Sequence, residues 1–495
     1  MIHRQKIADI QGGLHVVKKS HLFGTDGIRG PYGKYPIVES LAYVLGQKLY
    51  KYFTKPSEQS SGNKKIPGTL LTCRDSRYSS VSLEQALHQG VKDVGGIPVS
   101  MSVAPTPACL FELKKMDVLC GVVISASHNP YTDNGFKIFN SDGQKLTDEQ
   151  ENNLARELTE DTSCMSKERN FSQPLVTQAP ENYYRYLKEH LDRIIACHSG
   201  VKKTVTVVIV SAHGACSQIA KRLFTDSKTF RFHVINASPN GKNINLGVGA
   251  TSPNSLQTKV KELRADVGIA YDGDGDRILL CSREGEIING DVLLGLLAIW
   301  LHKTGSHDGR RFATTIVANG GLSKVLAARG IKTYHSLVGD RELAELMEKQ
   351  DVYFGGEPSG HLIFRDHLLC GDGLYATLKI LEFTLTSLLH EPSCHWSELI
   401  KMVPLRSSHM ISKEVLEKVP LSEMKELATI LLEVDKGLKQ SSPDGEGRVL
   451  WRYSGTEKKL RILVEGHQKS EVIQVANMLM AKSLESIAQY CKIVR

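Results

Sequence analysis

The chain has 495 residues, of which 41% are apolar and 23% charged, and its formal net charge is +8. This length exceeds one hydrophobic core of the usual ~100–200 residues, so three or four domains are expected. Because the basic residues are spread in short runs such as Lys64-Lys65, the charge favours small anionic substrates or an ordinary solvated surface over nucleic acid.

The sequence favours a cytoplasmic protein without a membrane partner. Its first residues, MIHRQKIADIQGG, contain no apolar stretch of signal-peptide length, and the longest apolar run, residues 292–301, is half of the ~20 residues that a membrane span needs. The ten cysteines include no CxxC pair. Neither a disulfide framework nor a zinc site is therefore indicated.

Short β-branched runs alternate with amphipathic segments in the first part of the chain, which predicts α/β layers. A strand at 69–72 leads into CRDSR, and helices are predicted at 82–94 and 110–115 before a second strand at 121–124. The stretch 159–174 is polar and aperiodic, and we predict a linker there.

Two further α/β modules follow. One opens with the strand 205–210 and closes near the strand 267–271, and the other runs through 314–321 and 352–357 to a helix that starts near Gly373. In each module a β-rich run is followed by a small-residue turn, a serine and a helix. This similarity indicates one α/β module that is used repeatedly.

The last hundred residues have a different pattern. Residues 447–466 predict two strands around a turn. One face of a following helix is then apolar, formed by Val472, Ile473, Val475, Ala476, Leu479 and Met480. This segment predicts a small α+β domain.

The motif YDGDGDR directly follows the strand at 267–271. Asp272, Asp274 and Asp276 alternate with glycine. Three carboxylates this close repel one another unless a cation neutralises them, and hard oxygen ligands suit Mg²⁺. An EF-hand is excluded, because its glycine and glutamate positions hold Arg277 and Arg283. The alternative is an acidic surface turn.

The motif SASHNP follows the strand at 121–124. Ser127 there is either a helix N-cap or a nucleophile, and no GxSxG elbow surrounds it. Lys137, downstream of a turn, is by itself typical of a solvated surface. In FGTDGIRG, Arg29 could grip a phosphate or belong to a structural turn. CRDSR adds Arg74 and Arg77 at another predicted strand end, where surface ion pairs are the simpler interpretation.

Two later motifs offer polar groups to a ligand. GGEPSGH combines Glu357, Ser359 and His361, whose carboxylate, hydroxyl and imidazole suit sugar hydroxyls, although such a histidine is more often structural. RYSGTE, with the next strand, predicts an anion nest or a polar hairpin turn formed by Arg452, Ser454, Gly455, Thr456 and Arg461. A candidate nucleophile, a Mg²⁺ site, a loop suited to sugar hydroxyls and a loop suited to phosphate thus occur in four separate segments. Together they indicate phosphoryl transfer on a sugar phosphate.

FGTDGIRG, SASHNP, DGDGDR, GGEPSGH and RYSGTE occur in the order found in the α-D-phosphohexomutases, and the chain resembles that family over nearly its whole length. The resemblance implies three related α/β domains and a C-terminal α+β domain around a central cleft. We predict their bounds as 1–172, 173–286, 287–399 and 400–495.

The resemblance also implies roles for these residues. Ser127 would be the phosphorylated catalytic serine and would hold Mg²⁺ together with the three aspartates. Arg29, His128 and Lys137 would assist at the reacting oxygens, with Lys137 as a proton shuttle. Glu357, Ser359 and His361 would bind the sugar. The loop residues Arg452, Ser454, Gly455 and Thr456, with Arg461, would anchor the phosphate that is not being transferred.

The family reaction moves phosphate between O1 and O6 through a bisphosphorylated sugar, and a hexose 1,6-bisphosphate would act as activator. The partner would be a small sugar phosphate, and the protein would be a monomer or homodimer. The stretch 240–257 and the VGDR motif at 338–341 resemble the phosphoglucosamine mutase branch. Pro358, Tyr453 and Lys458 depart from the usual residues, which leaves the phosphomannomutase/phosphoglucomutase branch as the alternative.

Two functions of other classes remain as rivals. A Mg²⁺-dependent sugar phosphatase would pass the phosphate to water, but the DxDxT signature of one large phosphatase superfamily is absent, because Asp276 stands where threonine is expected. A non-catalytic sugar-phosphate sensor would have no need of Ser127.

Overall fold

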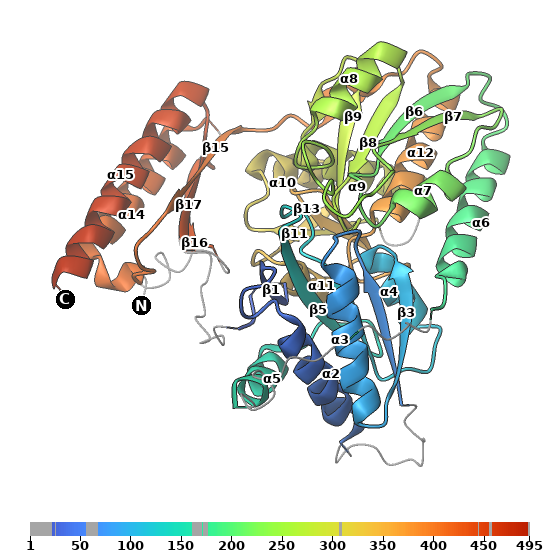
Figure 1. Cartoon of the computed structure of the whole chain (residues 1–495). Coiled ribbons are helices and arrows are strands. Elements are labelled where there is room, and N and C mark those ends of the chain that lie inside the picture. The colour runs from blue at the N-terminus through green and yellow to red at the C-terminus, as the bar shows by residue number, and fades with distance from the viewer. Residues whose placement is uncertain are drawn as a thin grey trace. The chain divides into compact units, whose positions relative to one another are not determined.

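A computed structural model describes residues 22–24, 26–55, 68–160, 171, 177–305, 309–443, 445–454 and 458–493 (Figure 1). The chain forms two compact units. One unit contains the described residues of Lys19–Leu293 and Tyr353–Lys401. The other contains the described residues of Leu294–Val352 and Met402–Arg495.

The first sheet holds the N-terminal part of the chain, with strand order β1-β5-β4-β2-β3. Its strands are β1 (Ile28–Pro31), β2 (Thr69–Arg74), β3 (Ile97–Val103), β4 (Cys120–Ile124) and β5 (Asp133–Asn140). The parallel strands β2, β3 and β4 end at one edge of the sheet, and β5 returns antiparallel between β4 and β1. The loops after β2, β3 and β4 therefore meet at that edge.

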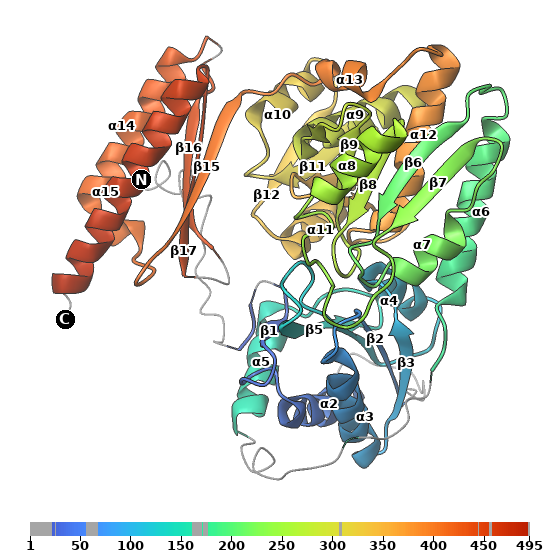
Figure 2. The ribbon, with the colours of Figure 1, turned by 45° about the horizontal axis from the view of Figure 1, so that its top comes forward.

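Helices cover this sheet and supply its core. They are α2 (Glu39–Thr54), α3 (Ser80–Asp93), α4 (Thr106–Leu113) and α5 (Asp148–Glu160). Figures 1 and 2 both show α2 and α3 side by side. The apolar residues of α2 and α3 are buried in one cluster with those of β2, β4 and β5.

The second sheet repeats this plan, with order β10-β9-β8-β6-β7. Its strands are β6 (Val205–Val210), β7 (Phe230–Ile235), β8 (Val267–Tyr271), β9 (Ile278–Ser282) and β10 (Ile287–Ile288). The helices are α6 (Glu181–Cys197), α7 (Ser217–Leu223) and α8 (Asn254–Leu263). Because β6, β7 and β8 are parallel, the turn after β8 lies at the same edge as the loops after β6 and β7.

The same unit also contains a later hairpin and helices. The hairpin is formed by β13 (Phe354–Glu357) and β14 (His361–Phe364), which pair antiparallel. The long helix α12 (Gly373–His390) begins where the sequence predicts it, and α13 (Trp396–Leu399) follows.

The other unit contains a parallel pair of strands with two helices. These elements are β11 (Arg311–Thr315), α10 (Gly320–Ala327), β12 (Lys332–Ser336) and α11 (Asp340–Lys349). The apolar run of residues 292–301 lies within α9 (Gly290–Thr304) and is almost entirely buried.

The C-terminal elements of this unit form the predicted α+β domain. Strands β15 (Ser407–Glu414), β16 (Arg448–Tyr453) and β17 (Lys459–Gly466) pair antiparallel in the order β15-β17-β16. Helices α14 (Lys425–Ser441) and α15 (Lys469–Ile493) lie on one face of this sheet (Figure 2). The core between them includes the fully buried Trp451, whose indole N–H donates to Ser483 Oγ over 3.0 Å.

Some boundaries differ from the sequence prediction. Helix α4 begins at Thr106 and not at Leu110. Pro107 is compatible with this start, because N–H groups in the first turn of a helix have no intrahelical partner and proline has no N–H. The predicted linker 159–174 begins inside α5, and most of it lies outside the described residues. None of the described helices combines the length and apolar character that crossing a bilayer requires.

Candidate active site

Ser127 lies in the loop that follows β4, at the edge where the parallel strands end. Its side chain is 1% exposed, and its backbone φ of 51° is in the left-handed region. The hydroxyl donates a hydrogen bond to Asp272 Oδ2 over 2.6 Å. Ser127 lies in a turn and no helix begins after it, so the N-cap interpretation is wrong. The loop instead directs the serine hydroxyl at the carboxylate motif of the second sheet.

Asp272, Asp274 and Asp276 form a buried cluster directly after β8. Each offers a carboxylate oxygen, and the three oxygens lie within 4.8 Å of one another. Their burial rules out the acidic surface turn. Gly275 has a φ of +75°, which L side chains rarely adopt, and a Cβ added there would lie 2.3 Å from Cys216 Sγ. Glycine at this position lets the turn bring the carboxylates together.

The chemistry of this cluster fits a divalent cation. Asp274 Oδ1 and Asp276 Oδ1 are buried and receive no hydrogen bond from the residues that the structure describes. Burial, and then the carboxylates of Asp276 and Asp274, raise the pKa of Asp272 well above its ordinary value. Buried oxygens without donors and mutually repelling carboxylates are what a hard cation such as Mg²⁺ would neutralise.

Lys137 of β5 lies beside the aspartate cluster and is 2% exposed, so it is not a surface lysine. Its Nζ is 2.7 Å from Asp274 Oδ2, 2.8 Å from Asp276 Oδ2 and 3.2 Å from Asp26 Oδ2. Burial lowers the pKa of Lys137, but the three carboxylates outweigh it and hold that pKa well above the ordinary value. The side chain is therefore an ammonium ion in this arrangement.

Arg29 of β1 and Asp26 complete the charged group around Lys137. Arg29 forms an ion pair with Asp26, which also pairs with Lys145. Burial raises the pKa of Asp26, but Lys137, Lys145 and Arg29 lower it well below its ordinary value. Sequence reasoning missed Asp26 as the carboxylate that joins these cations, although its place between two glycines in FGTDGIRG was a signal.

His128 is adjacent to the serine, with its Nδ1 3.5 Å from Ser127 Oγ. Burial, followed by the nearby guanidinium groups of Arg277 and Arg29, lowers the pKa of His128 to about 4. The imidazole is therefore neutral near pH 7. In the sequence, Arg277 serves only as evidence against an EF-hand, and nothing in its pattern predicts its effect on the pKa of His128.

The predicted sugar loop is the turn between β13 and β14. Glu357 and His361 are buried at the two strand ends and face each other in register, and Ser359 is exposed in the turn. Gly360, with φ +92°, packs so closely that an added Cβ would lie 1.9 Å from the Ile278 carbonyl oxygen. The loop is therefore fixed against the segment that follows the aspartate cluster.

His361 has the contact expected of a structural histidine. Its Nε2 accepts a hydrogen bond from the backbone N–H of Gly371 over 3.0 Å. An added Cβ at Gly371 would lie 2.2 Å from the Asp276 carbonyl oxygen, so this histidine supports backbone that packs on the metal loop. Substrate binding by His361 stays a prediction.

The predicted phosphate loop joins β16 and β17 in the other unit. Arg452 and Arg461 are directly opposite each other in the antiparallel register. Ser454 is buried, its N–H donates to the Lys459 carbonyl over 2.8 Å, and its own carbonyl accepts from Lys418 Nζ over 2.7 Å. The hairpin thus gathers these side chains at one end, and the predicted Gly455 and Thr456 lie outside the described residues.

Family models for phosphoglucomutase/phosphomannomutase match four successive parts of the chain. They are the alpha/beta/alpha domains I, II and III and the C-terminal domain, at residues 20–164, 181–285, 289–401 and 416–482.

Individual relatives cover nearly the whole chain. A phosphoglucosamine mutase of Nautilia profundicola is 36% identical over 91% of this chain and 96% of its own length, and one of Bdellovibrio bacteriovorus is 33% identical over 93% and 97%. A solved phosphoglucomutase/phosphomannomutase family protein of Burkholderia thailandensis is similar in fold, with a TM-score of 0.73 and 20% identity, covering 94% of this chain and 98% of that one. The chain therefore belongs to the α-D-phosphohexomutase family of intramolecular phosphotransferases, as its motifs predict.

Proposed function

We propose that this enzyme interconverts glucosamine 6-phosphate and glucosamine 1-phosphate, with Ser127 as the carrier of the phosphoryl group. The observation that supports this most strongly is the hydrogen bond from Ser127 Oγ to Asp272, which places a buried hydroxyl at the carboxylate cluster. The sugar is inferred from relatives that are named phosphoglucosamine mutase.

In the proposed reaction, a sugar hydroxyl oxygen bonds to the phosphorus of phosphorylated Ser127 while the bond from phosphorus to Ser127 Oγ breaks. The hydroxyl proton must leave the sugar, and the neutral imidazole of His128 is in the form that accepts one. Lys137, as an ammonium ion, is in the form that can supply the proton that Ser127 Oγ takes up as its bond to phosphorus breaks, consistent with its predicted role as proton shuttle. The resulting bisphosphate then turns and returns its other phosphate to the serine.

Ser127, Asp272, Asp274 and Asp276 are the residues proposed to hold Mg²⁺. The ion would neutralise negative charge on the transferring group. Arg29 and the Asp26 carboxylate keep Lys137 oriented toward the cluster by the ion pairs described above. Glu357 and Ser359 are proposed to bind sugar hydroxyls, and the hairpin residues Arg452, Ser454, Gly455, Thr456 and Arg461 to anchor the second phosphate.

Membership of this family also supports proposals for the domain bounds, the activator, the location and the oligomeric state. The four domains are proposed to span 1–172, 173–286, 287–399 and 400–495. A hexose 1,6-bisphosphate is the proposed activator, because it can phosphorylate Ser127 before the first turnover. The protein is proposed to act in the cytoplasm as a monomer or homodimer.

The test is a mutase assay on the purified protein with Mg²⁺ and a trace of the matching sugar 1,6-bisphosphate. Glucosamine, glucose and mannose phosphates are compared by kcat/KM, and free phosphate is followed in parallel. A clear lead for glucosamine phosphate supports the proposal. A lead for glucose or mannose phosphate assigns the other branch and makes Pro358 the first residue to exchange. Phosphate release without isomerisation would assign a phosphatase.

A further inference from the structure

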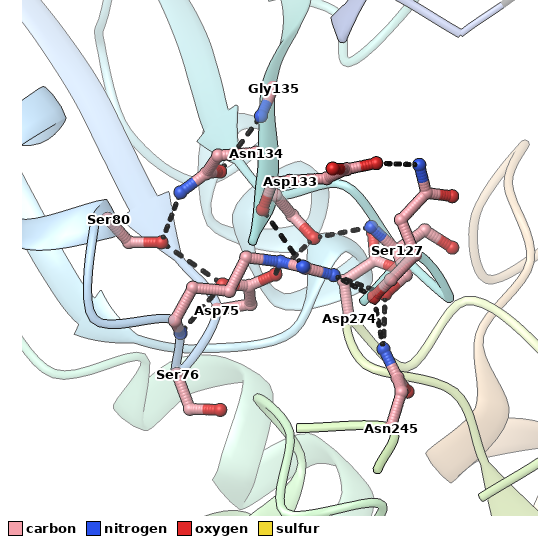
Figure 3. A network of polar contacts seen from close by, with 12 residues as sticks. Asp75, Ser76, Ser80, Ser127, Asp133, Asn134, Gly135, Asn245 and Asp274 are labelled. Atoms are coloured by element: carbon pink, nitrogen blue, oxygen red, sulfur yellow. Dashed lines mark hydrogen bonds and ion pairs between the residues drawn. The ribbon is translucent and has the colours of Figure 1, made fainter. Parts of the chain in front are cut away.

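The backbone of Ser127 is held in an unusual conformation. Its φ of 51° is rare for a residue other than glycine, asparagine or aspartate, so surrounding contacts must stabilise it. The contacts converge on the carbonyl oxygen of Ser127, which accepts hydrogen bonds from Arg77 Nη2 over 2.9 Å and from Asn245 Nδ2 over 2.8 Å. Figure 3 shows Asn245 pointing at the backbone of Ser127.

Arg77, expected on the surface, is buried and 2% exposed, and it comes from the loop after β2. Its guanidinium donates to the carbonyl of Asn129 over 2.9 Å and to that of Asp133 over 2.9 Å, and also to the carbonyl of Pro130. One planar side chain thus binds four carbonyls of the serine loop. It fixes the course of the loop from Ser127 to the start of β5.

Asp75 holds Arg77 and the serine loop from the other side. Its Oδ2 accepts from Arg77 Nε over 2.7 Å and from Ser125 Oγ over 2.6 Å. Ser125 Oγ in turn accepts the backbone N–H of Ser127 over 2.8 Å. Both the N–H and the carbonyl of Ser127 therefore end in one buried network (Figure 3).

Asn245 reaches the serine from the second sheet. It lies in the loop before α8, has a φ of 58°, and donates its backbone N–H to the Ala212 carbonyl over 3.0 Å. Its amide also donates to the Asn129 carbonyl over 3.2 Å. The side chain therefore connects the serine loop of the first sheet with the sheet that carries the aspartate cluster.

We propose that Arg77 and Asn245 are positioning residues for Ser127. They hold its backbone in the left-handed conformation that directs Oγ at Asp272, and Asn245 keeps this loop in place relative to the metal loop. Neither residue touches the reacting atoms. The inference rests on the proposed function in so far as Ser127 carries the phosphoryl group.

The first test is Asn245→Ala, with Asn243→Ala as the matched control. Asn243 lies in the same loop, and its amide donates to the Ser238 carbonyl over 3.0 Å, away from the serine. Misplacement of a nucleophile should lower kcat by roughly ten- to a hundred-fold. KM should stay within about twofold, because no substrate contact is lost. Phosphate released per isomerisation should also rise, which a general loss of folded protein would not cause.

Arg77→Lys supplies the second test, because lysine keeps the charge beside Asp75 but cannot bind the four carbonyls. It should show the same fall in kcat and the same rise in phosphate release. If this variant does not fold, Asn245→Asp, which keeps the shape of the side chain and removes the donor, takes its place.

An activity-independent readout separates this inference from the proposed function. The rate at which a sugar 1,6-bisphosphate phosphorylates Ser127 is followed by intact mass. A wild-type protein that is labelled but does not isomerise would overturn the proposed function, while slower labelling of Asn245→Ala would still support the positioning role. Equal kcat, phosphate release and labelling rate in Asn245→Ala and Asn243→Ala would overturn the inference.

Discussion

Ser127 Oγ lies 2.6 Å from Asp272 Oδ2, although the two residues are 145 positions apart in the chain and follow strands of different sheets. The loop that carries Ser127 follows β4, and the aspartate motif follows β8. Each loop by itself is only a group of polar residues after a strand. Their contact creates a buried hydroxyl beside three carboxylates.

Ser127→Ala should abolish mutase turnover and labelling by the sugar bisphosphate, because no other hydroxyl occupies its position. The fold should remain, since only one oxygen is removed and the backbone contacts of residue 127 persist. Turnover, intact mass and thermal unfolding are the measurements. Ser141→Ala, at an exposed turn, is the control and should match the wild type. Wild-type turnover in Ser127→Ala would refute the phosphoserine mechanism.

Asp274→Ala should remove the response of the protein to Mg²⁺. In the wild type, added Mg²⁺ should raise the unfolding temperature, because binding to the folded state at ~100 times Kd contributes about 2.7 kcal/mol. The variant should lose most of this shift, together with roughly 10²-fold or more of its activity. Asp142→Asn, at an exposed turn, should retain both. An unchanged Mg²⁺-dependent shift in Asp274→Ala would exclude this cluster as the metal site.

Arg452→Ala should weaken substrate binding through the phosphate that is not transferred. Loss of a charged hydrogen bond costs about 1.5–3 kcal/mol, or roughly 10- to 150-fold in KM. Steady-state kinetics test this, with Lys458→Ala as the control, because Lys458 is exposed in the same hairpin. A fall in kcat without a rise in KM would contradict the anchoring role.

Gly360→Ala should lower the free energy of unfolding by more than the cost of placing alanine at a positive φ. A Cβ there would lie 1.9 Å from the Ile278 carbonyl oxygen, whereas at Gly33, with φ +81°, it would meet nothing within 4 Å. Gly33→Ala therefore measures the cost of the backbone conformation, about 1 kcal/mol, and the excess in Gly360→Ala measures the clash. Chemical denaturation gives both values. Equal losses would mean that the loop is not packed as described.

Acidification should reduce stability through His88. Burial, with a smaller contribution from Lys92, lowers the pKa of His88 from 6.5 to about 3. The unfolded chain therefore binds a proton that the folded chain excludes, so this contribution is complete above pH 6.5 and is lost as the pH falls toward 3. The slope approaches ~1.4 kcal/mol per pH unit.

His88→Gln tests this pH dependence. Between pH 7 and 5 its free energy of unfolding should fall less steeply than that of the wild type, measured by denaturant titration at each pH. His467→Gln, at an exposed position, should leave the wild-type slope unchanged. Parallel slopes for His88→Gln and the wild type would show that His88 is protonated equally in both states.

The sequence alone determined the elements and the chemical motifs of this protein. Strand runs such as Val205–Val210 and the helix from Gly373 are encoded locally, because β-branched runs and apolar periodicity are properties of neighbouring residues. The aspartate motif is local too, since alternation of carboxylates with glycine indicates a cation site before any fold is known. The metal ligands could therefore be predicted from this motif, and the nucleophile from the resemblance of the ordered motifs to the family, and both stay predictions.

Only the tertiary structure decided which polar residues are buried and what they contact. Arg77 and Lys137 resemble surface residues in the sequence, and Asp26 and Asn245 attracted no prediction. Their partners lie far along the chain, 50 positions for Arg77 with Ser127, 118 for Asn245 with Ser127 and 137 for Lys137 with Asp274. A buried charged side chain is stable only when it is paired with an opposite charge or with hydrogen-bonding groups. Because these partners are distant in the sequence, only the strand order and the packing of the folded chain bring them together.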